Sequence, residues 1–476
     1  MQQFPAAAHH VAQHPITNDS HVLGEKEILG TLTWESRNAP INSRQWPLRK
    51  KWATTSIVSA FTYLSSVSTP MISPTLDQIG QDLLLTTEIQ HQLTMSIIVL
   101  AFAVGPVILA PLSEVYGRSP MLQLSNFFFL VWNVACAFSK NKSEMFAFRF
   151  LSGIGGSAAM AVGEGTVSHC WEPERRGTAI AIYSLTPLLG PVIGPISGAW
   201  IAEKSTWRWV FWSTSIFGAT VQVLGLCFLQ ESFAPVILQH HTKRLGVPLQ
   251  ENIEATKSIP RLLALGTSLI RPARLLTTQP VVQMIALYMV YVYGLFYLFL
   301  STFPGVWQGV HHESTGIAGL NYISLGVGFV LGVQIGGRLK DLIYVTLKAR
   351  NFNRGRPESR IPLMIIGSYF VSTGIFWYGW SVQARAHWIV PNFGIAVFAS
   401  GCIVCLQCMQ AYIVDNYTRF AASAMAAAVV VRSLAGFGLP LFAPYLYNRL
   451  DYGWGNSVLG LISIGLGIPA PLGFWF

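Results

Sequence analysis

The stretch Tyr183–Gly198 reads YSLTPLLGPVIGPISG and lies inside an apolar run from Ala179 to Ala202. This run has the length that one helical crossing of a bilayer requires. Three glycines recur at every fourth position and so share one face of a helix: Gly190, Gly194 and Gly198. Three prolines recur in the same way on a neighbouring face: Pro187, Pro191 and Pro195.

A helix with this composition would be poor in water, because each internal proline removes a hydrogen bond and crowds the preceding turn. A membrane tolerates it where neighbouring helices satisfy the freed backbone groups. The glycine face lets another helix approach closely. A packing helix of any membrane protein would explain the glycines alone, but the repeated Gly-Pro at this spacing is more specific.

The composition of the whole chain agrees with a membrane protein. Of its 476 residues 52% are hydrophobic and only 11% are charged, whereas soluble domains carry about 25% charged residues. The formal net charge of +10 comes from basic residues between the apolar runs rather than along one long face. We therefore expect no nucleic-acid partner.

Apolar segments of membrane-spanning length predict an all-α membrane protein with twelve transmembrane helices in two six-helix halves. The expected spans are Trp52–Pro74, Leu93–Leu112, Met121–Phe138, Met145–Val167, Ala179–Ala202, Val210–Leu229, Val281–Phe303, Ile317–Ile335, Pro362–Val382, Trp388–Tyr412, Ala421–Leu441 and Trp454–Phe476. We expect a disordered cytosolic tail at 1–51, a first half at 52–230, a cytosolic linker at 231–280 and a second half at 281–476. A weak repeat before the fifth and eleventh spans, Glu174–Ala179 and Tyr417–Ala422, supports this division.

The loops carry an asymmetric charge. If the amino terminus is cytosolic, only these basic residues fall outside: Lys140, Lys142, Lys204, Arg208, Arg385 and Arg449. This distribution fits the positive-inside rule and predicts that both termini are cytosolic. The polar start of the chain lacks the apolar segment of a secretory signal peptide.

Two motifs resemble those of the major facilitator superfamily. The repeated Gly-Pro stretch resembles the "antiporter" motif in the fifth helix of exporters of this family, which lies between the two halves. The loop Ala110–Arg118, with Glu114, Gly117 and Arg118, resembles the signature loop of the family. Such a loop can hold neighbouring helices by ion pairs that break when the halves rock. A solvated cytosolic turn is the alternative interpretation. Val115 and Ser119 stand where basic residues are common in the family, so we expect fewer of these ion pairs here.

Several further segments are similar to the fungal twelve-span drug:proton antiporter branch of this family: Asn321–Gly326, Phe376–Trp380, Tyr417–Ser423, Arg432–Pro444 and Tyr452–Ser457. This branch includes polyamine, azole and mycotoxin exporters. The resemblance covers nearly everything from Trp46 onward and implies the major facilitator fold. The family usually ends in a short charged tail, so the end at Phe476 is expected to reflect truncation.

Three residues of the fourth span are the candidates for proton coupling: Arg149, Glu164 and His169. A charge at membrane depth is costly and suggests a function. Arg149 matches the arginine of the fourth-helix motif of the family and could tune an acid or hold a carbonyl group, or its side chain could reach the headgroups. Glu164 could carry a proton or be a structural, cytosol-facing acid. The family more often places the acid where His169 stands, and the first span contains no acid.

The seventh and eleventh spans contain the candidate substrate-binding residues: Tyr288, Tyr291, Tyr293, Tyr297 and Arg432. Tyrosine rings and hydroxyls would suit a planar, amphipathic molecule. Each tyrosine could equally belong to a core stripe, and Arg432 could equally form a structural pair.

The sequence contains no P-loop spacing, no catalytic constellation and no convincing metal site. Cys402, Cys405 and Cys408 are expected to pack as small apolar residues, and His311-His312-Glu313 is expected to be solvated surface. We therefore expect no enzyme and no cofactor, with the proton gradient as driving force. The sequence predicts a monomeric exporter of hydrophobic or amphipathic small molecules in the plasma membrane. The alternatives are export of a polyamine or other organic cation, and proton-independent facilitation; nutrient uptake is disfavoured.

Overall fold

The computed structural model describes residues 43–233, 276–350, 357–416 and 421–467, together with residues 236, 237, 274 and 469. The long helices are α2 (Leu48–Ser68), α4 (Glu88–Tyr116), α5 (Arg118–Ala137), α6 (Lys142–Cys170), α7 (Pro173–Lys204), α8 (Arg208–Phe228), α12 (Pro280–Gly309), α14 (Tyr322–Arg350), α15 (Ile361–Gln383), α16 (Ile389–Asn416) and α17 (Ala421–Gly467). The short helices are η1 (Ser43–Gln45), η2 (Pro70–Thr75), α3 (Leu76–Asp82), α13 (Thr315–Leu320) and η3 (Pro357–Arg360).

The helices account for the twelve predicted crossings. Ten helices of the described part are long and apolar enough to cross a membrane. The helix α2 is an eleventh, because it lies beside α6, α7 and α8 in the same bundle. The helix α17 supplies two crossings, since Asp451 interrupts it with a positive φ of 52°.

The predicted boundaries differ from the structure at the start of the chain. The first span was expected at Trp52–Pro74, but α2 ends at Ser68 and the tighter turn η2 follows. Pro70 and Pro74 lack the amide hydrogens that would continue an α-helix. Residues 43–51, which we assigned to the tail, are helical at η1 and from Leu48 onward. The tail before Ser43, most of the linker, Tyr417–Phe420 and the last residues lie outside the described part.

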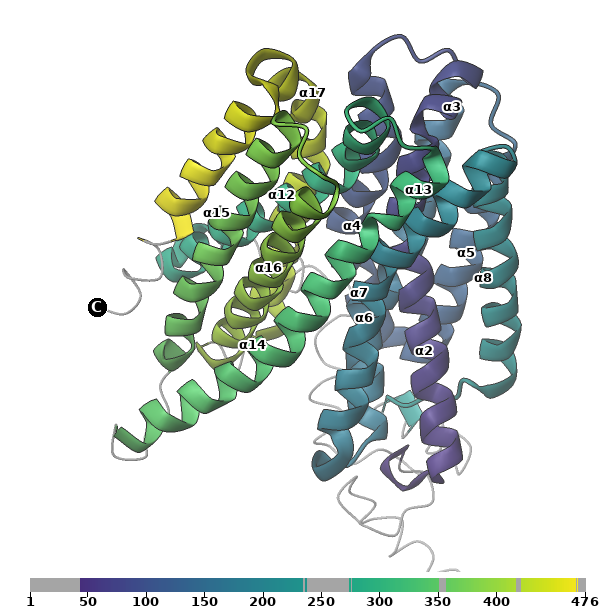
Figure 1. Ribbon diagram of the computed structural model, residues 1–476. Helices are drawn as coiled ribbons and strands as arrows, with labels where there is room; N and C mark the ends of the chain where they lie inside the picture. The colour runs from purple at the N-terminus through teal and green to yellow at the C-terminus, as the bar shows by residue number, and fades with distance from the viewer. Residues whose placement is uncertain are drawn as a thin grey trace, which may run out of the picture.

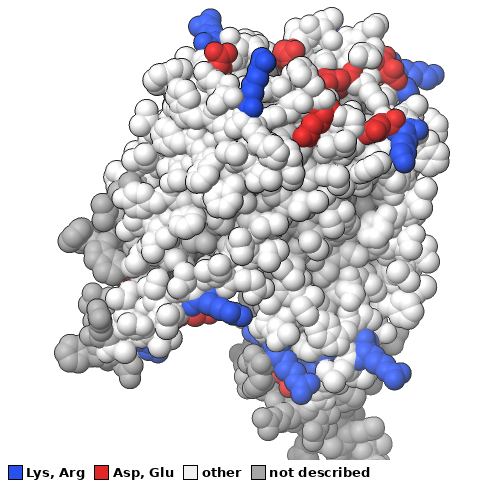
Figure 2. All heavy atoms as spheres, viewed as in Figure 1, with Lys and Arg blue, Asp and Glu red and all other residues white. Residues whose placement is uncertain are grey.

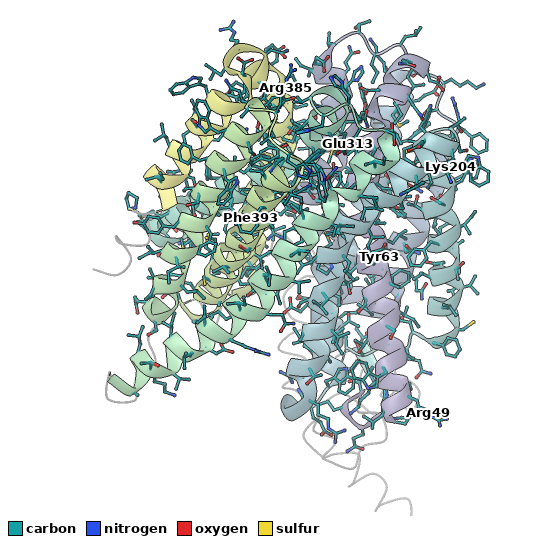
Figure 3. The ribbon with its side chains drawn as sticks, viewed as in Figure 1. Arg49, Tyr63, Lys204, Glu313, Arg385 and Phe393 are labelled. Atoms are coloured by element: carbon teal, nitrogen blue, oxygen red, sulfur yellow. The ribbon has the colours of Figure 1, made fainter. Side chains whose placement is uncertain are left out.

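The helices form two bundles that stand side by side (Figure 1). The first half contains α2 to α8, and the second half contains α12 to α17. We call the end that carries η1 the amino-terminal face and the end that carries α3 and α13 the opposite face. In Figure 3 Arg49 marks the amino-terminal face, whereas Lys204 and Arg385 mark the opposite face.

Two pairs of long helices form the seam between the halves: α4 contacts α17, and α7 contacts α14 together with α13. Small residues make close approach possible there. A Cβ atom added to Gly319 would lie 2.5 Å from the Cβ of Ala199, and one added to Gly326 would lie 2.9 Å from a methyl carbon of Val192. In a bilayer such small-residue contacts supply the packing that holds helices together.

The halves are joined at the opposite face. Ser73 Oγ donates to the carbonyl oxygen of Leu300 at 2.8 Å and lies 3.4 Å from the hydroxyl of Tyr322. Glu203 Oε2 accepts from the amide of Gly316 at 2.5 Å and from Ser314 Oγ at 3.5 Å. At the amino-terminal face, by contrast, the surface is hollowed between the halves (Figure 2). The described part of the molecule is therefore closed at one face and hollowed at the other.

Candidate functional site

The glycine face of α7 packs against the first crossing. Cβ atoms added to Gly190 and Gly198 would lie 2.3 Å from Ser66 Oγ and 2.0 Å from the Met71 carbonyl oxygen, respectively. A Cβ at Gly194 would lie 3.1 Å from Val67. The glycines thus permit the close approach that their spacing predicts, but the partner is α2 with η2 in the same half. The neighbouring face of α7, with Val192 and Ala199, meets the second half.

The helix α7 continues through all three internal prolines, Pro187, Pro191 and Pro195. Pro191 and Pro195 are buried, and Pro187 is half-buried. Each lacks the amide hydrogen that would bond to the carbonyl group one turn earlier. Contact with helices on two faces stabilises this otherwise weak helix.

Arg149 is completely buried near the opposite face. Its Nη1 donates to the carbonyl oxygen of Ser68 at 3.1 Å, and its Nε donates to that of Thr94 at 3.3 Å. Its guanidinium carbon lies 5.8 Å from the ring centre of Phe211. The described residues include no carboxylate paired with it. Arg149 therefore holds the end of α2 and the first turns of α4, and it does not reach toward headgroups.

Glu164 is exposed on α6, far from Arg149. The 15 residues between them correspond to about 22 Å along the helix axis. Met160, one turn before Glu164 on the same face, packs against the hydrophobic cluster that runs into the second half. We infer that Glu164 lies beside the seam, toward the amino-terminal face. The three candidates for proton coupling do not form one cluster.

His169 is half-buried at the amino-terminal face. Its ring contacts that of Phe233 edge-on, with 5.9 Å between the ring centres, and its carbonyl oxygen accepts from Ser43 Oγ at 3.0 Å. Arg44, Arg118 and Arg176 lie within electrostatic range of its ring. His169 therefore lies in a positively charged part of the amino-terminal face.

The signature loop forms a tight connection between α4 and α5. Gly117 has a φ of 103°, a conformation that side chains rarely adopt. Glu231 follows α8 and accepts from the amide of Ser119 at 3.1 Å, at the start of α5. Arg118 lies against Gly165 and 5.3 Å from the ring centre of Phe233. Glu114 is exposed, and the described residues include no ion pair that it forms.

Two of the four candidate tyrosines lie in the core of the second half. The hydroxyl of Tyr288 lies 2.6 Å from Ser368 Oγ, and the hydroxyl of Tyr291 donates to the carbonyl oxygen of Leu459. Both side chains are buried. The structure thus differs from the expectation that they face a cavity, because their hydroxyls are bonded to α15 and α17 within the bundle.

Tyr293, Tyr297 and Arg432 come together at the seam. The guanidinium carbon of Arg432 lies 4.8 Å from the ring centre of Tyr293, whose ring centre is 5.1 Å from that of Tyr297. A Cβ added to Gly436 would lie 3.1 Å from both Tyr297 and Val99 of α4. Tyr297 is buried, whereas Tyr293 and Arg432 are half-buried. This cluster joins a cation and aromatic rings where the second half meets α4.

Polar networks at the opposite face were not anticipated from the sequence. Asn392 Nδ2 donates to Asn321 Oδ1 at 2.5 Å, and Asn321 Nδ2 donates to Glu313 Oε2 at 2.7 Å. Glu313 lies near the seam (Figure 3). Asp82 accepts from Trp207 Nε1 at 2.8 Å and forms an ion pair with Arg208. The signal that could have found them is asparagine or aspartate at the ends of apolar helices.

The sequence is similar to those of known membrane transporters. The family model of the Major Facilitator Superfamily matches residues 54–440. The chain is 48% identical over 449 residues to the efflux pump vrtL of Penicillium aethiopicum. The aligned region covers 93% of this chain and 88% of that protein. The chain is 34% identical to the efflux pump radE of Floropilus chiversii, covering 100% of this chain and 91% of that protein. These relatives confirm the resemblance to fungal exporters.

Solved structures agree on the fold. The xylose transporter XylE of E. coli, in a partially occluded inward-open conformation, superposes with a TM-score of 0.67 at 18% identity, covering 90% of this chain and 97% of that chain. The human organic anion transporter MFSD10 superposes with a TM-score of 0.58 at 14% identity, covering 90% and 99%. At these identities the likeness concerns the fold alone.

Proposed function

Because the chain belongs to the major facilitator superfamily and is therefore a membrane transporter rather than an enzyme, we propose that it exports an amphipathic small molecule in exchange for protons. The observation that carries this proposal is the half-buried pair of Tyr293 and Arg432 at the seam. The printed names of the fungal relatives, efflux pumps, support the direction of transport. A secondary metabolite of the producing cell is the substrate class that we propose.

The shape of the seam supports alternating access as the mechanism. Hydrogen bonds join the halves at the opposite face, while the amino-terminal face is hollowed. Small residues such as Gly319 and Gly326 let the halves rock without large side chains in the way. A substrate would enter from the amino-terminal face and leave when the opposite face opens.

The charge at the seam favours one substrate class over another. Arg432 brings a positive charge beside Tyr293, and a polyamine at this place would be repelled. A neutral or acidic amphipathic molecule could stack on the tyrosine ring and accept from the guanidinium group. We therefore prefer such a substrate to a polyamine or another organic cation.

Orientation is part of the proposal. We place the amino-terminal face in the cytosol and the protein in the plasma membrane, since the helix ends at that face carry Arg49, Lys50, Lys51, Arg118, Arg175 and Arg176. The opposite face shows most of the acidic residues together with some basic ones (Figure 2). Protease digestion of a tag before Ser43 in intact cells tests this orientation. Protection of the tag is expected, and cleavage without permeabilisation would contradict it.

Substrate class is tested with vesicles that contain the purified transporter and are loaded with lipophilic dyes of similar size. One dye is neutral, one anionic and one cationic. Neutral and anionic dyes should leave faster than the cationic dye, and Arg432→Glu should reverse this order. Preference of the wild-type protein for the cation would overturn the proposed substrate class.

A further inference from the structure

A small cavity of about 240 Å³ lies between the two halves at the opposite face. The first half contributes Asp77, Glu88 and Gln92, and the second half contributes Tyr447 and Tyr452. The cavity is separate from the Tyr293–Arg432 cluster, since neither of those residues lines it. Its size is below the range of about 300–1,000 Å³ that is usual for drug-sized ligands. A ligand of this cavity would therefore be small.

The cavity carries negative charge. Asp77 and Glu88 are exposed carboxylates in its wall, and His91 Nδ1 lies 3.9 Å from Asp77 Oδ1. The described residues that line the cavity include no lysine or arginine. Two carboxylates beside one imidazole attract cations and repel anions. The cavity therefore favours cations, whereas Arg432 at the seam is expected to repel them.

Gln92 provides an independent indication of a ligand. Its side chain lines the cavity and is 8% exposed, yet its Oε1 has no hydrogen-bond partner among the described residues. A buried polar atom without a partner costs about 1–3 kcal/mol. A ligand that donates a hydrogen bond or carries positive charge would relieve this cost.

Two aromatic rings complete the wall on the side of the second half. The ring centres of Tyr447 and Tyr452 are 4.9 Å apart. The hydroxyl of Tyr447 donates to Asn456 Oδ1 at 3.0 Å, which fixes that ring. Aromatic faces together with carboxylates recognise organic ammonium groups. A metal ion fits less well, because no three His, Cys, Asp or Glu side chains of the described part could hold one.

We propose that this cavity is a binding site for a small organic ammonium ion, such as a quaternary alkylammonium. The bound ion would bridge the two halves at the opposite face. The bound ion would contact carboxylates of the first half and rings of the second, so it would stabilise the closed arrangement of this face. The site does not depend on which substrate the transporter exports.

Calorimetric titration of the purified, detergent-solubilised protein tests this site directly. The probe is choline, and its control ligand is the uncharged isostere in which carbon replaces the quaternary nitrogen. Choline should bind at least about tenfold more tightly than the isostere. Equal binding of the two, or no binding of choline, would overturn the proposal.

Matched variants locate the site. The double variant Asp77→Asn, Glu88→Gln should weaken choline binding about tenfold, and Tyr452→Ala should weaken it about fivefold because the second half then loses a ring. Glu144→Gln is the control, since Glu144 is half-buried at the same face but does not line the cavity. Unchanged affinity in the double variant would contradict the site, and unchanged affinity in Tyr452→Ala would contradict the bridge.

Elution of every variant at the same volume as the wild type in gel filtration establishes that each variant is folded. Because binding is measured without transport, failure here leaves the proposed export unaffected.

Discussion

Arg149 Nη1 donates to the carbonyl oxygen of Ser68 at 3.1 Å and thereby fixes the fourth crossing to the last turn of the first. The same guanidinium group donates to Thr94 of α4. One buried side chain thus joins three helices of the first half at the opposite face. The contacts of Arg149 are therefore structural, and a role in proton coupling would be additional to them.

Substitution of Arg149 should therefore reduce stability. Arg149→Ala removes two hydrogen bonds from a charged donor to buried carbonyl oxygens, at a cost of about 1.5–3 kcal/mol each. We expect a thermal unfolding midpoint several degrees below that of the wild type in detergent, and a smaller decrease for Arg149→Lys, which keeps one donor group. An unchanged midpoint for Arg149→Ala would show that these hydrogen bonds do not hold the helices.

The glycine face of α7 predicts a graded response. Gly198→Ala places a methyl group 2.0 Å from the Met71 carbonyl oxygen, so the helices must separate. Gly194→Ala, with a nearest contact of 3.1 Å, should be milder. Gly177→Ala is the matched control on the same helix, because a Cβ there meets nothing within 4 Å. We expect loss of folded protein in gel filtration in the order Gly198, Gly194, Gly177. If Gly198→Ala behaved like Gly177→Ala, the close approach to η2 would be refuted.

Glu203 should control the closed face. Its carboxylate accepts from the amide of Gly316 in the other half, a charge-assisted bond. Glu203→Ala should shift the population toward opening there and accelerate labelling of a cysteine introduced at buried Ser301, whose hydroxyl bonds only within α12, by about fivefold. A membrane-impermeant maleimide supplies the measurement, in a background where exposed Cys227 is replaced by serine. Glu144→Ala should leave the rate unchanged; an equal rate in Glu203→Ala would contradict a gate at this place.

The tyrosines of α12 should separate into two groups. Tyr288→Phe removes the hydrogen bond to Ser368 and should lower stability by about 1 kcal/mol with little effect on substrate affinity. Tyr293→Ala removes the ring beside Arg432 and should raise the KM for the transported dye several-fold while the protein stays folded. A larger change of KM in Tyr288→Phe than in Tyr293→Ala would reverse our assignment of Tyr288 to the core and of Tyr293 to the substrate-binding seam.

Sequence periodicity predicted the existence of the helices better than the direction of their side chains. The spacing of Gly190, Gly194 and Gly198 correctly indicated a face for close packing, because that property depends on one helix alone. Which helix meets that face depends on the whole bundle, and it is α2. Tyr288 and Tyr293 have similar sequence surroundings, yet only the neighbours α15 and α17 decide which is buried.

We propose above all that the protein exchanges substrate for protons, and that the carboxylate of Glu164 carries the proton. Purified transporter in vesicles, preloaded with a neutral lipophilic dye, is subjected to a pH gradient of each sign. The wild-type protein should move dye against its gradient only when protons flow the other way. Glu164→Gln should lose this uphill movement and keep downhill flux, while Glu172→Gln, at an exposed acid of the same face outside the candidate residues, should behave as the wild type. Dye flux that is identical with and without the pH gradient would contradict the account and make the protein a facilitator.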